Sequence, residues 1–259
     1  MKIINAILIL STLIVGALLY PQLPEQMPMH WNALGKIDGY MPKNMALLFM
    51  PVLMIVMYIS FRIFPDFDPK KEKYKLFARE WNIMQTALIG FFTYMHFMII
   101  YLTLNPGVSM MPLMFIGLGT LFILMGNYMS KIRQNYFIGI KVPWTLSSED
   151  NWNKTHRFAS WCFVGAGILT LIEAYFIWYA PAVIFGSIIL AAFLPIVYSF
   201  LLYKKAIHQM KYVYLGILLV IAGIILLRGM TPEDTWICSE GKWVQHGKPS
   251  TPMPTTECQ

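Results

Sequence analysis

The feature that most constrains this chain is a series of long apolar runs separated by polar segments. About seven can be read, each close to the ~20 helical residues that cross a bilayer. They are residues 3–20, 46–64, 83–104, 111–128, 158–178, 183–203 and 212–229. Backbone facing lipid must satisfy its own hydrogen bonds, and the runs are too long and too uniformly apolar for barrel strands. The sequence therefore predicts an all-α, polytopic transmembrane helix bundle of about seven spans.

Composition and charge agree with a multi-pass protein of the plasma membrane. Of the 259 residues, 57% are hydrophobic and 13% charged, too few charges to coat a soluble domain. The net charge of +7 would favour a nucleic-acid partner in a soluble protein, but here it gathers in alternate loops, so no direct nucleic-acid binding is expected. The positive-inside rule predicts a cytoplasmic amino terminus, and an odd number of spans then puts the carboxyl terminus outside.

This orientation divides the chain into five segments. We expect a two-helix region with an extracytoplasmic loop, a basic cytoplasmic loop, a four-helix membrane region, one additional helix and an extracytoplasmic tail. Their bounds are 1–65, 66–82, 83–203, 204–229 and 230–259. The four-helix region contains a cytoplasmic loop, 130–157, whose sequence carries the most information.

That loop contains the run KIRQNYFIGIKVPWTL, residues 131–146. Gly139 and Pro143 bar a continuous helix, and aromatic side chains such as Trp144 suit the headgroup level of a membrane. Ser147, three residues before Asp150, predicts a capped helix start. The candidate ligand-binding or partner-binding residues of this loop are Asn135, Tyr136, Gly139, Lys141, Pro143, Trp144, Thr145, Trp152 and His156. An alternative of equal weight is that they form a conformationally demanding turn.

Outside this loop, polar residues at three places attract attention. The first outer loop offers His30, Trp31 and Asp38 as candidates for contact with a ligand. Within the spans, His96 and Glu173 could line a polar path or simply bond to neighbouring helices. In the tail, extracytoplasmic thiols tend to oxidise, and a bridge between Cys238 and Cys258 could contribute about 3 kcal/mol.

The loop motifs resemble those of the SdpI family of bacterial membrane immunity proteins. The resemblance rests on KIRQNYFIGIKVPWTL and NWNKTH, and on P-E-Q-M-P-M-H-W-N of the first outer loop, which resembles a short domain of unknown function that often precedes the family region. It covers roughly residues 8–203. It implies protection against a secreted toxin peptide that acts on the membrane, and, in the best-known member, recruitment of a cytoplasmic repressor. The expected partners are therefore the bilayer, such a peptide outside and a repressor or other protein inside.

Other functions receive less support from the residues. His30 with Asp38, or His156 with acidic neighbours, lacks the spacing of a known metal site, and no nucleotide loop or nucleophile turn is present, so we expect neither catalysis nor a metal or cofactor. A small-solute or proton-coupled transporter is the alternative. It predicts that His96 and Glu173 face each other across a cavity.

Overall fold

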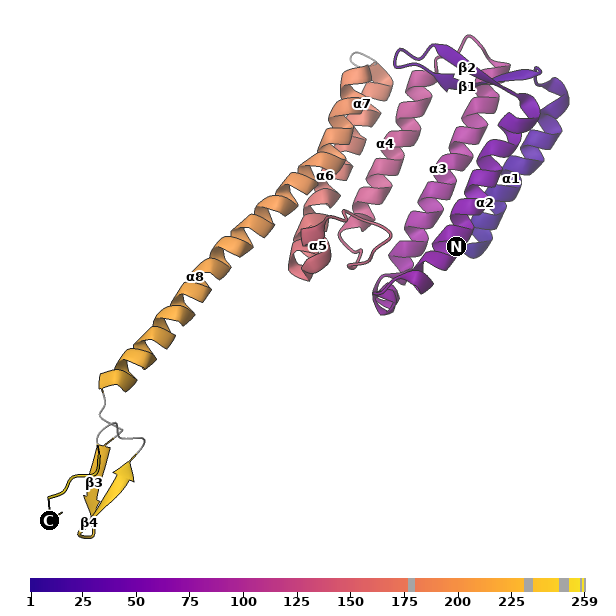
Figure 1. Cartoon of the computed structure of the whole chain (residues 1–259). Coiled ribbons are helices and arrows are strands. Elements are labelled where there is room, and N and C mark those ends of the chain that lie inside the picture. The colour runs from indigo at the N-terminus through magenta and orange to yellow at the C-terminus, as the bar shows by residue number, and fades with distance from the viewer. Residues whose placement is uncertain (177–179, 231–234, 247–251, 257, 259) are drawn as a thin grey trace. The chain divides into compact units, whose positions relative to one another are not determined.

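The computed structural model describes residues 1–176, 180–230, 235–246, 252–256 and 258 (Figure 1). It divides into two compact units, Met1–Tyr203 and Lys204–Gln259, each of which is described by itself.

The first unit is a bundle of helices with a β-hairpin at one end (Figure 1). Two short helical segments, η2 and α5, lie at the opposite end. In chain order its elements are α1 (Lys2–Leu19), η1 (Tyr20–Gln22), β1 (Gln26–Trp31), β2 (Ile37–Pro42), α2 (Lys43–Phe67), η2 (Lys71–Leu76), α3 (Ala78–Leu104), α4 (Met110–Met129), α5 (Pro143–Ser147), α6 (Glu149–Phe176), α7 (Ala180–Ile188), the π-helical η3 (Ile189–Phe193) and the start of α8 (Leu194–Met230). The sequence does not predict this hairpin, because Pro28 and Pro42 favour extended backbone but do not indicate which segments pair.

The predicted helical membrane architecture is confirmed, with a difference in the number of spans. Among the described residues, six stretches are long and apolar enough to cross a membrane: Lys2–Gln22, Lys43–Phe67, Ala78–Leu104, Met110–Met129, Glu149–Phe176 and Ala182–Gly223. The last is 42 residues long and takes in the predicted spans 183–203 and most of 212–229. Lysine is a good helix former, and neither proline nor glycine occurs at 196–215, so the backbone stays helical through the lysine-rich gap.

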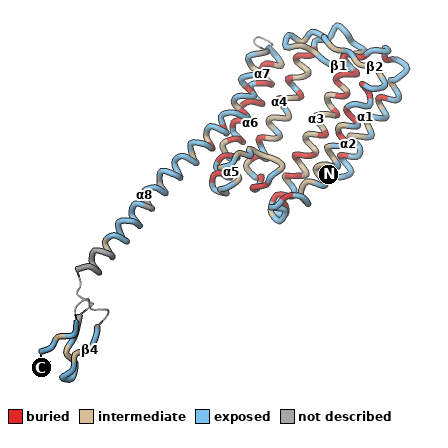
Figure 2. Tube along the Cα trace, in the orientation of Figure 1, coloured by how far each residue is buried: buried red, intermediate tan, exposed pale blue. Residues whose placement is uncertain are grey.

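The exterior of the first unit is apolar. Large hydrophobic side chains such as Ile7, Leu18 and Val52 are more than half exposed, whereas Met54 and Phe115 are fully buried. Figure 2 marks these burial classes along the chain trace. An apolar exterior is costly in water and suits contact with lipid chains.

Glycines let α4 and α6 pack closely. A Cβ on Gly167 would lie 2.7 Å from the carbonyl oxygen of Gly119, and one on Gly126 would lie 2.9 Å from the backbone nitrogen of Val164. The hydroxyl of Ser160 donates to the Gly126 carbonyl at 2.6 Å. Small residues and interhelical hydrogen bonds are the usual means of joining helices in a membrane, and they make this pair a rigid support for the loop between its members.

The second unit contains the continuation of α8 and a hairpin of β3 (Thr235–Ser239) and β4 (Lys242–His246). Glu240 and Gly241 form its turn with positive φ values of 53° and 76°, which glycine adopts readily. Cys238 and Cys258 form a disulfide. The tail is thus a small stapled hairpin.

Candidate functional site

Asp68 joins the loop 66–82 to the loop 130–157 at one end of the first unit. This carboxylate is 2% exposed and follows the last residue of α2. It accepts hydrogen bonds from the backbone N–H of Tyr136 at 2.8 Å, the hydroxyl of Tyr74 at 2.7 Å and the backbone N–H of Lys70 at 2.7 Å. A buried carboxylate needs such donors. Asp68 therefore fixes the loop 130–157, called the motif loop below, against the basic loop 66–82.

Asn135 holds the tightest part of the motif loop. It is fully buried, and its side-chain oxygen accepts from the backbone N–H groups of Phe137 at 2.9 Å and Ile138 at 2.8 Å, while its amide donates to the Arg133 carbonyl at 2.8 Å. The Tyr74 hydroxyl lies 3.4 Å from the same oxygen. Burial and the hydrogen bond to Asp68 raise the pKa of Tyr74 well above its ordinary value, so the hydroxyl remains a donor.

A second set of bonds joins the start of the motif loop to its end. The amide of Gln134 donates to the carbonyls of Thr145 at 2.7 Å and Leu146 at 2.9 Å. Lys70 donates to the side-chain oxygen of Gln134 and reaches the Leu146 carbonyl at 3.3 Å. The loop is thereby closed on itself and held again by the basic loop.

Gly139 and His156 meet inside the loop. His156 is fully buried; its Nδ1 donates to the Trp152 carbonyl at 2.8 Å and its Nε2 accepts the backbone N–H of Ile140 at 3.0 Å, an assignment made from the hydrogen-bond network and corresponding to neutral imidazole. Gly139 has φ of 112°, and a Cβ there would lie 2.4 Å from Nε2. Only glycine fits at this position.

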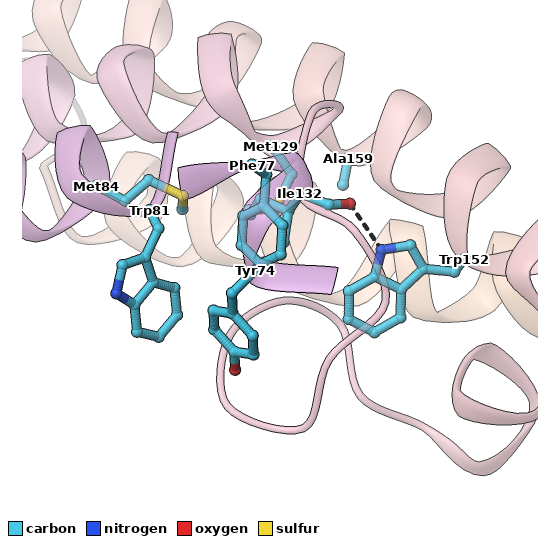
Figure 3. Close-up of a cluster of buried hydrophobic side chains, with 8 residues drawn as sticks. All are labelled: Tyr74, Phe77, Trp81, Met84, Met129, Ile132, Trp152 and Ala159. Carbon is cyan, nitrogen blue, oxygen red and sulfur yellow. Dashed lines mark hydrogen bonds between the residues drawn. The ribbon is translucent and has the colours of Figure 1, made fainter. Parts of the chain in front are cut away.

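Trp152 packs on His156 and extends the support. The two rings lie on one face of α6 and stack with centroids 4.0 Å apart, and the indole donates to the Ile132 carbonyl at 2.9 Å. Figure 3 shows this bond within a cluster of buried side chains from the basic loop, α3, α4, the motif loop and α6. The cluster consists of Tyr74, Phe77, Trp81, Met84, Met129, Ile132, Trp152 and Ala159.

Two further polar residues of the motif lie in the short helix α5. Thr145 forms hydrogen bonds with the backbone that precedes this helix, and Trp144 joins the helix to α8. Buried Thr145 donates to the Ile140 carbonyl at 2.7 Å and accepts from the Val142 N–H at 3.1 Å. The Trp144 indole donates to the Ser199 hydroxyl at 2.7 Å. At the start of α6, Ser148 rather than the predicted Ser147 accepts a backbone N–H, that of Asn151, at 3.2 Å, because Ser147 belongs to α5.

Other candidates on this loop lie on its surface. Tyr136 is 43% exposed, and Lys141 and Pro143 are also exposed. Lys141 donates to the carbonyls of Tyr136 and Phe137 at 3.2 and 2.9 Å. The motif therefore combines a buried framework with a small exposed surface.

At the other end of the unit, the β1–β2 hairpin holds the outer candidates. His30 and Asp38 pair across it at 2.5 Å, with side chains 72% and 42% exposed. Trp31 is half-buried and packs toward α2, α3 and α4, where Met27 and Leu23 anchor the hairpin in the core. The hairpin thus presents one ionisable pair to the surroundings from a fixed position.

The two intramembrane candidates have different neighbours. His96 lies on α3 against α1, with Nε2 3.8 Å from the position of a Cβ on Gly16. Glu173 is buried on α6, which packs mainly on α4 and α7. This arrangement does not support the facing pair that the transporter alternative requires. Within the described ranges, no group of three His, Cys, Asp or Glu side chains is placed to hold a metal ion.

The sequence reasoning missed Asp68, Tyr74, Lys70 and Gln134. The lysine-rich sequence of the basic loop indicates only a segment that anchors the topology at the membrane surface, and Gln134 lies within the quoted motif but is not among its candidate residues. The available signal was local. Asp68 and Pro69 directly follow the apolar run of α2, and an Asp-Pro pair at a helix end is typical of a turn in which the carboxylate bonds to nearby backbone.

Comparisons with known proteins agree with the motifs. Residues 131–199 match the SdpI/YfhL protein family, and residues 7–55 match a domain of unknown function, DUF1648. The immunity protein SdpI of Bacillus subtilis (strain 168) is 27% identical over 205 residues, which make up 79% of this chain and 96% of that protein. No solved structure matches the chain. The predicted resemblance is confirmed: the chain carries an SdpI/YfhL family region with DUF1648 before it.

Proposed function

We propose that this protein is a membrane immunity protein that protects its cell against a secreted, membrane-active toxin peptide. The observation that carries the proposal is the similarity to an immunity protein along 96% of that protein's length. Signalling to a cytoplasmic repressor or another protein is part of the same proposal.

The hairpin is the surface we assign to the toxin peptide. Its exposed side chains include Leu34, Ile37 and Tyr40, which are 70%, 40% and 63% exposed. These apolar groups lie on the same hairpin as the His30–Asp38 pair. A membrane-active peptide is itself amphipathic, and such a surface offers it both apolar contacts and a polar pair.

The motif loop has a different part in the proposal. Its buried members, Asn135, Gly139, Thr145, Trp152 and His156, form the framework. A cytoplasmic partner would meet the exposed residues Lys131, Tyr136 and Lys141. Substitutions of the two groups should therefore have different effects. Changes to the buried residues should lower the amount of folded protein, whereas changes to the exposed residues should lower activity while the amount of folded protein stays constant.

The test is survival of a sensitive bacterial strain that expresses the protein and is challenged with an SDP-like toxin peptide. We expect Leu34→Ser and Tyr40→Ser to lose protection at wild-type membrane levels. Val108→Ser is the matched control, because Val108 is 40% exposed in the α3–α4 turn, outside the hairpin. Equal protection by all three variants would refute the hairpin assignment. No protection by well-inserted wild type would refute immunity to this peptide.

The proposal includes a cytoplasmic amino terminus and an extracytoplasmic hairpin. Alkaline phosphatase inserted after Gly35 should be active, and the same reporter inserted after Lys71 should be inactive, because the enzyme requires an oxidising compartment. The reverse pattern would overturn the orientation.

A further inference from the structure

A cleft of about 330 Å³ opens where the basic loop, the motif loop and α6 meet. It is lined by Lys73, Leu76, Arg133, Gln134, Glu149 and Asn153. The framework around Asp68 and Gln134 holds two of its walls together. The cleft is separate from the hairpin, which lies at the opposite end of the unit (Figure 1).

The cleft carries an excess of positive charge. Lys73 forms an ion pair with Glu149. Arg133 is exposed, and the ion pairs found among the described residues include none of its own. Burial and the nearby charge of Lys70 lower the pKa of Lys73. Two cations, Lys73 and Arg133, thus line the cleft against one carboxylate, Glu149, while Lys70 and the buried Asp68 carboxylate lie together behind this lining. An added anion would stabilise the uneven pair of charges in the cleft.

The cleft is also amphipathic. Leu76 is 70% exposed on its rim, and the exposed amide of Asn153 lies on its wall. The cleft lies at a loop end of the membrane bundle, the level at which phospholipid headgroups are found. An inorganic anion would satisfy the cations and leave Leu76 in water, whereas a phospholipid would satisfy both.

We propose that this cleft binds the headgroup of an anionic phospholipid, with Arg133 and Lys73 on the phosphodiester and Leu76 against the first carbons of the lipid. Arginine presents several donors in a plane and matches phosphate oxygens well. Lys73 exchanges part of its contact with Glu149 for the phosphate. Glu149 is therefore a competitor of the ligand.

The experiment titrates the purified full chain, in a neutral detergent, with dioctanoyl phosphatidylglycerol and follows binding by native mass spectrometry. We expect saturable binding that weakens roughly tenfold in Arg133→Gln. Lys75→Gln is the matched control. It removes one positive charge from the same basic loop, but Lys75 is 77% exposed, pairs with Glu72 and does not line the cleft. This control should bind as wild type does.

Glu149→Gln supplies a test of opposite sign. Removing the competing carboxylate should tighten binding of the lipid, whereas a purely structural ion pair predicts no tightening. Melting temperatures of the variants are measured alongside, and since the Arg133 side chain is exposed, its substitution should leave folding intact.

Several outcomes would overturn the proposal. Equal losses in Arg133→Gln and Lys75→Gln would mean general surface attraction without a site. Unchanged binding in Glu149→Gln would remove the cleft as the location. Inorganic phosphate that competes fully with the lipid at equal concentration would mean a free-anion site, and dioctanoyl phosphatidylcholine that binds as tightly would remove the requirement for net negative charge.

Discussion

Replacement of Gly139 by alanine tests whether the motif loop is held as the contacts indicate. With φ of 112°, the position is one that L-residues rarely adopt, and the new Cβ would lie 2.4 Å from His156 Nε2 and 3.0 Å from the Trp152 ring. Backbone strain of about 1–3 kcal/mol would add to about 1–3 kcal/mol for the lost bond between His156 and the Ile140 N–H. We therefore expect Gly139→Ala to lower the free energy of unfolding by about 2–6 kcal/mol.

The assay is thermal unfolding in detergent, followed by intrinsic tryptophan fluorescence. On the scale of about 2–4 °C per kcal/mol for folded domains of this size, the melting temperature should fall by roughly 4–24 °C. Gly90→Ala is the matched control, because a Cβ on Gly90 would meet no atom within 4 Å. Equal melting temperatures for Gly139→Ala and wild type would refute the proposed contact with His156.

Three further predictions concern other parts of the chain. Gly167→Ala, whose Cβ would lie 2.7 Å from the Gly119 carbonyl, should separate α4 from α6 and lower the free energy of unfolding by about 1–3 kcal/mol. The control Gly165→Ala, whose Cβ would have its nearest contact at 3.6 Å, should melt at the wild-type temperature. Equal melting temperatures for Gly167→Ala and wild type would contradict the close helix contact. The Asn5 side chain is 1% exposed, and its amide has no hydrogen-bond partner in the described structure. Asn5→Leu should therefore stabilise the protein by about 1–2 kcal/mol. A melting temperature below that of wild type would contradict this and reveal a role for the amide. Maleimide should label Cys162 alone in denatured, unreduced protein, because the other two cysteines form the tail disulfide, and three labels per chain would refute that bridge.

The membrane helices could be predicted because the length of an apolar run is a local property. The exception is residues 182–223, where hydropathy and backbone propensity give different answers. Lys204, Lys205 and Lys211 interrupt the apolar pattern, which suggests a loop, but they do not interrupt the helix. A polar gap indicates a break only when residues that end helices accompany it.

The candidate site could be predicted only in part, since its framework depends on contacts far apart in the sequence. The four-residue spacing of Trp152 and His156 predicts that they share a helix face, and Gly139 indicates that the helix is interrupted. The partners of that turn could not be read in the same way, because Asp68 bonds to Tyr136 across 68 residues and Lys70 to Gln134 across 64. The local sequence around the basic loop suggests only a solvated, positively charged segment.

The position of Asp68 has a consequence for chimeras of this protein and its relatives. The two family regions, 7–55 and 131–199, are separated by a segment that neither covers, and the carboxylate that holds the motif loop lies in that segment. A chimera that joins the amino-terminal half of one relative to the carboxyl-terminal half of another at residue 100 would pair each motif loop with a foreign basic loop. Exchange of the motif region must therefore carry residues 68–77 with it, so that the carboxylate and the loop that it closes come from the same parent.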